Sequence, residues 1–344
     1  MQKANEPRRT RRSGEDLPPE LRASFSWQLS LPVLSPLENS EDPCFSVKDP
    51  TVIHYQGRWH LFCTIRSAIR THQIQYVSFD RWENANSAPH HNLCCREDYF
   101  CAPQVFYFRP QKKWYLVYQV AEQDRNLKLQ PAFSTSRHIA DPGSWSPAKL
   151  FFPDGDPKGA TKWIDFWVIC DPERAYLFFT SLDGKMWRMW TPLKDFPYGF
   201  EHYQLALEAD IFEASHTYRL AGEDKYLTIV EAQGRTGRRY YKAYIAHGLE
   251  GKWRPLSDTQ KHPFAGAANV RQPEPPWADN ISHGELLRAG YDERLTIEPA
   301  NLQFLVQGVS DKLKAGKNYG EIPWQLGLLT RILKTSARQP GHKA

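Results

Sequence analysis

The stretch KDPTVIHYQGRWHLF, residues 48–62, decides the fold of this chain. An acid, Asp49, stands just before a short apolar run, and the turn residues Gln56 and Gly57 separate that run from a second one at residues 59–62. Two apolar runs joined by a two-residue turn indicate a β-hairpin. The stretch is therefore interpreted as a hairpin with a carboxylate at its start.

Four more segments repeat this phrase further along the chain. Each has a polar start, an apolar run, a turn and a second apolar run: residues 102–118, 164–179, 212–230 and 282–308. Three of the five copies carry a carboxylate near their start, namely Asp49, Asp165 and Glu213. We expect these three acids to occupy one equivalent position in their copies.

The repeat predicts an all-β fold, a five-bladed β-propeller. The copies start about 50 to 70 residues apart, which leaves room for roughly four strands in each, and such periods are typical of propeller blades. Helical periodicity is nearly absent. A strand at Trp27 is expected to pair with the closing strand near Trp324 and so to seal the ring. A pair of β-sandwiches is the rival interpretation, but it does not explain five hairpins with matched starts.

Composition and charge set the domain boundaries and exclude some partners. We predict a disordered basic segment at residues 1–24, one propeller domain at residues 25–333 and a disordered tail at residues 334–344. The net charge of +5 comes largely from these two ends, so a nucleic-acid partner is not expected. No apolar run reaches the length of a membrane-spanning helix, so no membrane partner is expected either. The six cysteines include no C-x-x-C pair, and their redox state stays open.

The three acids suggest acid–base chemistry. The innermost strand of each propeller blade lines a central channel, so equivalent positions on different blades converge on one axis. Carboxylates gathered there repel one another, and at least one pKa is expected to rise. Each acid alone is more simply a turn cap or the partner of a nearby base such as Lys48. A carboxylate ring that binds calcium is a third interpretation, although the D-x-D-x-D-G loop pattern is absent.

Eight phrases of the chain resemble glycoside hydrolase family 62, in the same order and over residues 25–330. They are KDPTV with YQGRWHLF, APQVFYFRPQKKWYLVYQ, WIDFWVICD with YLFF, FEASHTYRL with YLTIVEA, FAGAANV, ISHGEL, LTIEPANLQFLVQG and PWQLGLLT. That family contains α-L-arabinofuranosidases that remove arabinose side chains from arabinoxylan and arabinan. The resemblance implies an inverting, exo-acting α-L-arabinofuranosidase on a single five-bladed propeller.

The resemblance also assigns the catalytic roles. It implies that Asp49 is the general base, that Glu213 is the general acid, and that Asp165 tunes the acid and positions the sugar. Inverting glycosidases use two carboxyl groups that flank the scissile bond and leave room for a water molecule between them. Acids on separate blades are suited to that spacing.

Further site residues follow from the same resemblance. Lys48, Asn269 and Tyr319 are implied to contact the sugar. A structural calcium ion is implied in the central channel, near His283 and Gln303. A buried histidine that is hydrogen-bonded to neighbouring backbone explains His283 equally well.

Two other functions stay open at this point. One is a related propeller glycosidase, a β-xylosidase or an arabinanase, because the three-acid scheme is shared among such propellers. The other is a non-catalytic sugar-binding propeller, which would have little reason to keep three costly carboxylates together. The expected partner is a polysaccharide, and the protein is expected to be a monomer. The substrate class implies an extracellular location, although the start of the chain lacks the apolar segment of a secretion signal.

Overall fold

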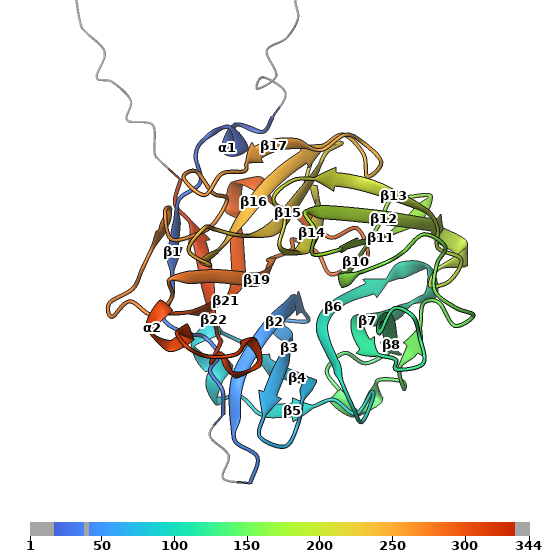
Figure 1. The fold of residues 1–344 in the computed structure, drawn as a ribbon, viewed down its shortest axis with the longest axis horizontal. Coiled ribbons are helices and arrows are strands. Elements are labelled where there is room, and N and C mark those ends of the chain that lie inside the picture. Colours follow the sequence, from blue (N-terminus) through green and yellow to red (C-terminus); the bar gives the residue numbers. More distant parts are fainter. Residues whose placement is uncertain (1–16, 38–40, 334–344) are drawn as a thin grey trace, which may run out of the picture.

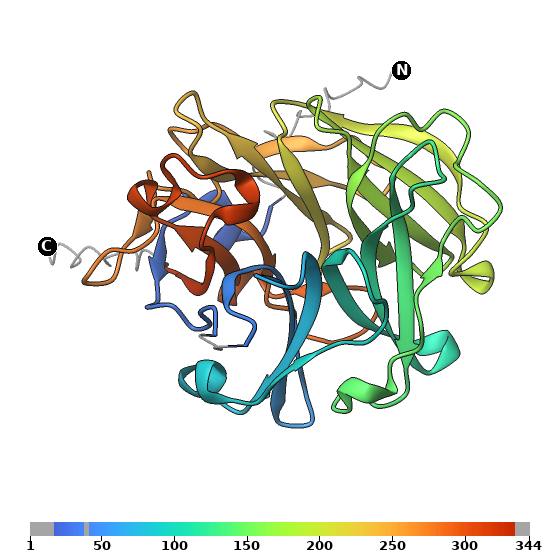
Figure 2. The ribbon, with the colours of Figure 1, turned by 60° about the horizontal axis from the view of Figure 1, so that its bottom comes forward.

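Five β-sheets surround a central axis in the computed structural model, which describes residues 17–37 and 41–333 (Figure 1). This arrangement confirms the predicted five-bladed β-propeller. Figure 2, turned by 60°, brings the blue and teal sheets forward. The predicted tail at residues 334–344 lies outside the described residues, as does the N-terminal segment up to residue 16.

The strands follow the chain from blade to blade. Blade 1 consists of β2 (Cys44–Tyr55), β3 (Arg58–Ser67), β4 (His72–Phe79) and β5 (His90–Asn92). Blade 2 consists of β6 (Phe100–Phe108), β7 (Lys113–Ala121), β8 (Leu129–Ser136) and β9 (Lys149–Leu150). Blade 3 consists of β10 (Ile164–Cys170), β11 (Arg174–Thr180), β12 (Lys185–Pro192) and β13 (Glu201–Glu208).

The last two blades have five strands each. Blade 4 consists of β14 (Glu213–Leu220), β15 (Tyr226–Gln233), β16 (Arg239–Ala246), β17 (Arg254–Ser257) and β20 (Thr296–Ile297). Blade 5 consists of β1 (Trp27–Leu29), β18 (Val270–Arg271), β19 (Asn280–Leu286), β21 (Gln303–Val309) and β22 (Gln325–Arg331).

Short helices lie in the described connections. They are α1 (Pro19–Arg22), η1 (Trp82–Ser87), η2 (Arg109–Gln111), η3 (Pro142–Ser144), η4 (Leu193–Asp195), η5 (Pro299–Asn301), α2 (Asp311–Lys314) and η6 (Tyr319–Glu321). The stretch with α2 and η6, red in Figure 1, lies beside β2.

The ring is closed by the N-terminal strand, as predicted. In blade 5, β1 pairs antiparallel with β22, with Trp27 opposite Arg331, and parallel with β18, with Trp27 opposite Val270. The Trp27 side chain is fully buried and its indole N–H donates to the carbonyl of Phe264. Strands from both ends of the chain thus share one sheet, which leaves no open edge at the closure.

The predicted N-terminal boundary at residue 24 differs from the structure. Residues 19–22 form α1, and Leu21 is only 2% exposed. The Arg331 guanidinium also donates to the carbonyl of Glu20. An apolar side chain among the prolines therefore anchors this piece to the propeller body, a contact that composition does not reveal.

One end of the central channel is spanned by the segment between β19 and β21. This segment bonds to the inner strands of four blades in turn: Arg288 to the carbonyl of Val52, the Tyr107 N–H to Tyr291, the Cys170 N–H to Glu293 and the Arg219 N–H to Leu295. The inner-strand partners lie toward the C-terminal ends of β2, β6, β10 and β14. The N-terminal halves of these strands, where the acids stand, therefore lie toward the other end of the channel.

Candidate active site

Every inner strand carries a β-bulge near its start. In β2, for example, Lys48 pairs with Thr64 but Thr51 pairs with Phe62, so that one extra residue is inserted. The same irregularity interrupts β6, β10, β14 and β19. A bulge sets two residues of one strand opposite one residue of the next, and it re-aims their side chains.

The bulges hold non-glycine residues in the left-handed backbone region. The φ angles are 49° at Asp49, 53° at Ala102, 57° at Asp165 and 49° at Ala214. A non-glycine residue held there costs on the order of 1–3 kcal/mol and persists only where the surroundings impose it. The strained residues occupy matched positions in the four strands, and two of them, Asp49 and Asp165, are catalytic candidates.

The expectation that all three acids occupy one position is wrong by one residue for Glu213. Asp49 and Asp165 are equivalent, but the residue that matches them in β14 is Ala214. Glu213 instead matches Lys48, the residue before Asp49. The reason is the bulge itself, because it brings two successive residues to the axis and either one can carry the acid.

The bulge N–H groups are bonded by side chains of the preceding blade around the ring. The acceptor is Gln307 Oε1 for Asp49 (2.8 Å), Thr64 Oγ1 for Ala102 (2.9 Å), Gln119 Oε1 for Asp165 (3.3 Å), Asp165 Oδ2 for Ala214 (3.0 Å) and Glu231 Oε2 for His283 (2.9 Å). Each blade thus holds the bulge of the next one. Asp165 thus belongs to this ring of hydrogen bonds and is also one of the three candidate acids.

Asp49 lies beside a lysine and a histidine. Its carboxylate is 3.5 Å from Lys48 Nζ and 3.6 Å from His283 Nδ1, and the residue is only 3% exposed. Burial would raise the pKa of Asp49, but the Lys48 charge, followed by that of His283, outweighs burial and lowers the pKa below its ordinary value. Asp49 is therefore an ionised carboxylate at neutral pH, which is the form a general base needs.

Glu213 lies among negative charges. Burial, then the Glu231 and Asp165 carboxylates, raise its pKa to about 8, against the opposing effect of Arg239, which donates to Glu213 Oε1 at 2.8 Å. Glu213 is therefore protonated at neutral pH, which is the form a general acid needs.

Asp165 interacts electrostatically with both Asp49 and Glu213. Burial, followed by the Asp49 charge, raises the pKa of Asp165 to about 7. Its Oδ2 accepts the N–H of Ala214, the residue directly after the acid. Asp165 thus contributes negative charge near Glu213 and also orients the backbone that carries Glu213.

Of the predicted sugar contacts, Lys48 and Tyr319 lie at the acids. Lys48 Nζ lies 4.8 Å from the centre of the Tyr319 ring, and the Arg239 guanidinium lies 5.7 Å from the same ring. Tyr319 is 42% exposed, whereas Lys48 is buried. Tyr319 therefore stands at the rim, with the charged groups beneath it.

The structure places Asn269 elsewhere. Its side-chain amide donates to the carbonyls of Phe25, Pro263 and Phe264, and its Oδ1 accepts the N–H of Gly266. These bonds use the amide to fasten its own loop to the N-terminal strand. No described contact links Asn269 to the acids, so the structure offers no support for a sugar contact through this side chain.

The residues predicted to hold calcium are not brought together. The β19–β21 register sets Gln307 opposite Ser282, next to His283, while Gln303 lies four residues earlier, at the start of β21, opposite Thr330 of β22. The His283 ring instead faces the Asp49 carboxylate. Among residues 17–37 and 41–333, no group of three histidine, cysteine or acidic side chains is placed to hold a metal ion. A calcium ion near His283 and Gln303 therefore stays a prediction.

The structure adds residues that the sequence analysis missed. Each second strand ends its apolar run on a polar side chain at the same place: Thr64, Gln119, Thr180, Glu231 and Gln307. All five are buried. This signal is present in the sequence, because a polar residue follows two residues such as Phe-Cys, Val-Tyr or Ile-Val in every copy.

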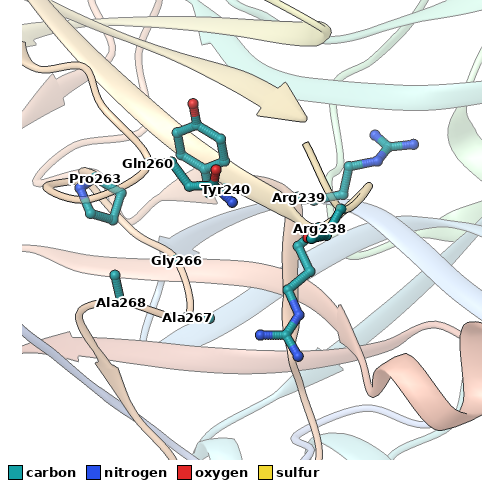
Figure 3. Close-up of a pocket in the computed structure, with 9 residues that line it drawn as sticks. Arg238, Arg239, Tyr240, Gln260, Pro263, Gly266, Ala267 and Ala268 are labelled. Carbon is teal, nitrogen blue, oxygen red and sulfur yellow. The ribbon is translucent and has the colours of Figure 1, made fainter. Parts of the chain in front are cut away.

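One pocket is lined in part by Arg239, the hydrogen-bond partner of the acid. It has a volume of about 330 Å³ and lies between residues 260–268 and the start of β16 (Figure 3). Arg239, which bonds Glu213, lines it together with Tyr240 and Pro263. Arg239 thus links this pocket to the acid, which is not itself among the lining residues.

The chain is similar to known proteins in sequence and in fold. Residues 35–330 match the model of Glycosyl hydrolase family 62. The chain is 39% identical over 318 residues to α-L-arabinofuranosidase C of Cellvibrio japonicus, which covers 90% of this chain but 48% of that protein. The chain thus spans about half the length of this curated relative.

Two solved structures are similar in fold and sequence. The catalytic domain of a family 62 α-L-arabinofuranosidase from Coprinopsis cinerea has a TM-score of 0.82 and 37% identity, covering 90% of this chain and 97% of its own. An α-L-arabinofuranosidase from Podospora anserina, solved with cellotriose, has a TM-score of 0.82 and 34% identity, covering 90% and 98%.

Proposed function

The chain belongs to glycosyl hydrolase family 62, and on that premise we propose that it is an inverting, exo-acting α-L-arabinofuranosidase. Its substrates are arabinofuranosyl side chains of arabinoxylan or arabinan. The observation that carries the proposal is the opposite tuning of two buried carboxyl groups: Asp49 is ionised, while burial and negative neighbours raise the pKa of Glu213 to about 8.

The roles follow from these protonation states. Asp49 accepts a proton from a water molecule as that water attacks the anomeric carbon of the arabinose. Glu213 donates its proton to the glycosidic oxygen, so that the polymer leaves as a neutral alcohol. Asp165 keeps Glu213 protonated by its charge and orients the Glu213 backbone through the Ala214 N–H.

Binding is proposed to involve the rim and the adjoining pocket. Lys48 and Tyr319 border the site of the arabinose, and Lys48 provides donors for sugar hydroxyl groups. The other end of the channel is spanned by residues 288–297, which suits a pocket that takes a terminal sugar rather than a threading chain. The pocket that Arg239 helps to line, between residues 260–268 and the start of β16, suits the polymer on the leaving-group side. Such a polymer substrate implies action outside the cell.

The test is arabinose release from wheat arabinoxylan, followed by proton NMR. The first-formed anomer of the released sugar reports inversion or retention, and the disappearing signals of the polymer report the linkage. Parallel assays use linear arabinan and an aryl β-xyloside. Release of xylose without arabinose would overturn the proposal, and binding of arabinoxylan without any sugar release would favour a sugar-binding propeller.

A further inference from the structure

Two fully buried polar side chains make hydrogen bonds that the chemical steps above do not use. Gln307 in β21 and Glu231 in β15 are both 0% exposed. Burying an amide and a carboxylate is costly unless each is hydrogen-bonded. Their partners show what they hold in place.

Their hydrogen bonds form one continuous chain. Gln307 Oε1 accepts the N–H of Asp49 (2.8 Å), and Gln307 Nε2 donates to Ser282 Oγ (3.2 Å). Ser282 Oγ donates to Glu231 Oε1 (2.9 Å), and the Arg239 guanidinium donates to the same oxygen. The chain ends where Arg239 donates to Glu213 Oε1 (2.8 Å). It therefore runs through buried side chains from the backbone of Asp49 to the carboxyl group of Glu213.

The two ends of this hydrogen-bond chain stand on blades that are not adjacent in the ring. Asp49 is on blade 1 and Glu213 on blade 4, and the connection passes through β19 and β21 of blade 5. An inverting glycosidase needs its two carboxyl groups about 6.5–9.5 Å apart, with a water molecule between them. A displacement of about 1 Å in such a site is enough to cost about 10²-fold in rate.

We propose that Gln307, Ser282 and Glu231 are positioning residues that, through Arg239, hold the base and the acid at a fixed separation. The assignment rests on the proposed function, because it needs Asp49 and Glu213 to act as a pair. The N–H that Gln307 accepts belongs to a strained residue with φ at 49°, so the bond selects one orientation of the base. Glu231 also accepts the N–H of His283, so it fixes the blade 5 bulge that carries Ser282.

A second buried glutamine provides a matched control. Gln104 is also 0% exposed and also joins two blades, since its Oε1 accepts the N–H of Val168 and its Nε2 donates to the Val168 carbonyl, both at 2.7 Å. No described contact of Gln104 reaches a site carboxylate. Gln104→Met removes two hydrogen bonds between blades, and Gln307→Met removes one between blades and one within blade 5, but only Gln307→Met acts on Asp49.

The experiment measures kcat and KM for arabinose release from arabinoxylan, together with Tm, for the full chain and both variants. We expect both substitutions to lower Tm. Gln307→Met should lower kcat by about 10- to 100-fold with KM within about twofold, by the sensitivity of rate to geometry. Gln104→Met should keep kcat within about twofold of the unmodified chain.

A milder variant guards against loss of the fold. Ser282→Ala removes a single hydroxyl group from the middle of the chain and should lower kcat several-fold. Substitutions in residues that act as one unit have non-additive effects, so the double variant Gln307→Met/Ser282→Ala should be about as slow as Gln307→Met alone. If Gln307→Met does not fold, the comparison of kcat between Ser282→Ala and Gln104→Met decides.

Three results would overturn the assignment. They are unchanged kcat in Gln307→Met and Ser282→Ala, an equal loss of kcat in Gln104→Met, and additive losses in the double variant. Absence of arabinose release by the unmodified chain is a different failure, because it would overturn the proposed function and the assignment with it.

Discussion

Blade 1 and blade 4 present the same structural unit with opposite electrostatics. Both inner strands carry a bulge at the same point of the repeat, and both place a buried carboxyl group at the axis. Asp49 has Lys48 and His283 beside it, whereas the pKa of Glu213 is raised by burial and by the Glu231 and Asp165 carboxylates.

The comparison shows that position and chemistry are separable in a repeat fold. The repeat determines where a carboxyl group can reach the axis, and the charges around it, from its own blade and from the neighbouring blades, determine its pKa. A lowered pKa at Asp49 and a pKa of about 8 at Glu213 leave a pH range, around neutrality, in which one group is ionised and the other is protonated. The predictions below test that difference, from the largest expected effect to the smallest.

Removing either member of the pair should have the largest effect. Asp49→Asn leaves no base for the water, and Glu213→Gln leaves no proton for the leaving oxygen, so each should lower kcat by about 10²–10⁴-fold. Arabinose release measures the loss, and circular dichroism checks that the fold is kept. Turnover near that of the unmodified chain in either variant would refute the assigned roles.

Asp165→Asn should narrow the gap between the pKa values of Asp49 and Glu213 by lowering the pKa of Glu213. The amide oxygen can still accept the Ala214 N–H, but the negative charge that raises the pKa of Glu213 is lost. Glu213 then loses its proton at lower pH, so the basic limb of the kcat profile should move down in pH, with a loss of about tenfold near pH 8. A basic limb that stays in place would show that Asp165 does not act on the acid.

Lys48→Met should narrow the same gap by raising the pKa of Asp49. Burial would raise the pKa of Asp49 once the opposing Lys48 charge is gone. The acidic limb of the kcat profile should therefore move to higher pH, with a loss of about tenfold at pH 5 that shrinks as the pH rises. The contrasting result, an equal loss at every pH, would indicate that Lys48 acts only by binding sugar.

The smallest effect concerns stability. Below its ordinary pKa of 4.5, Glu213 is protonated in both the folded and the unfolded chain. Between pH 4.5 and about 8 the unfolded chain releases this proton and the folded chain keeps it, so the folded state loses stability as the pH rises. Glu213→Gln cannot titrate and should melt about 2–4 °C above the unmodified chain at pH 8, with no difference near pH 4. Thermal melts across this range measure it, and a constant difference would contradict the linkage.

The sequence alone determined the fold class and much of the site. Strand pairing requires alternation and turns that are local in the chain, so five hairpin phrases were enough to predict five blades. The acids were found because they recur at the start of these phrases. The closure by the strand at Trp27 was also predictable, because a ring without free edges needs a partner for its last strand.

Only the tertiary structure decided which side chains meet. The bulges shift the register by one residue, so Glu213 matches Lys48 and not Asp49. The same register brings Gln307 to the base and leaves Gln303 away from it. Spacing along a strand does not reveal such shifts, because a one-residue change moves a side chain to the other face. The pKa values depend on both levels: Lys48, the residue before Asp49, and Glu231, the strand partner of Glu213, are local, whereas His283 and Asp165 act from other blades that only the ring brings close.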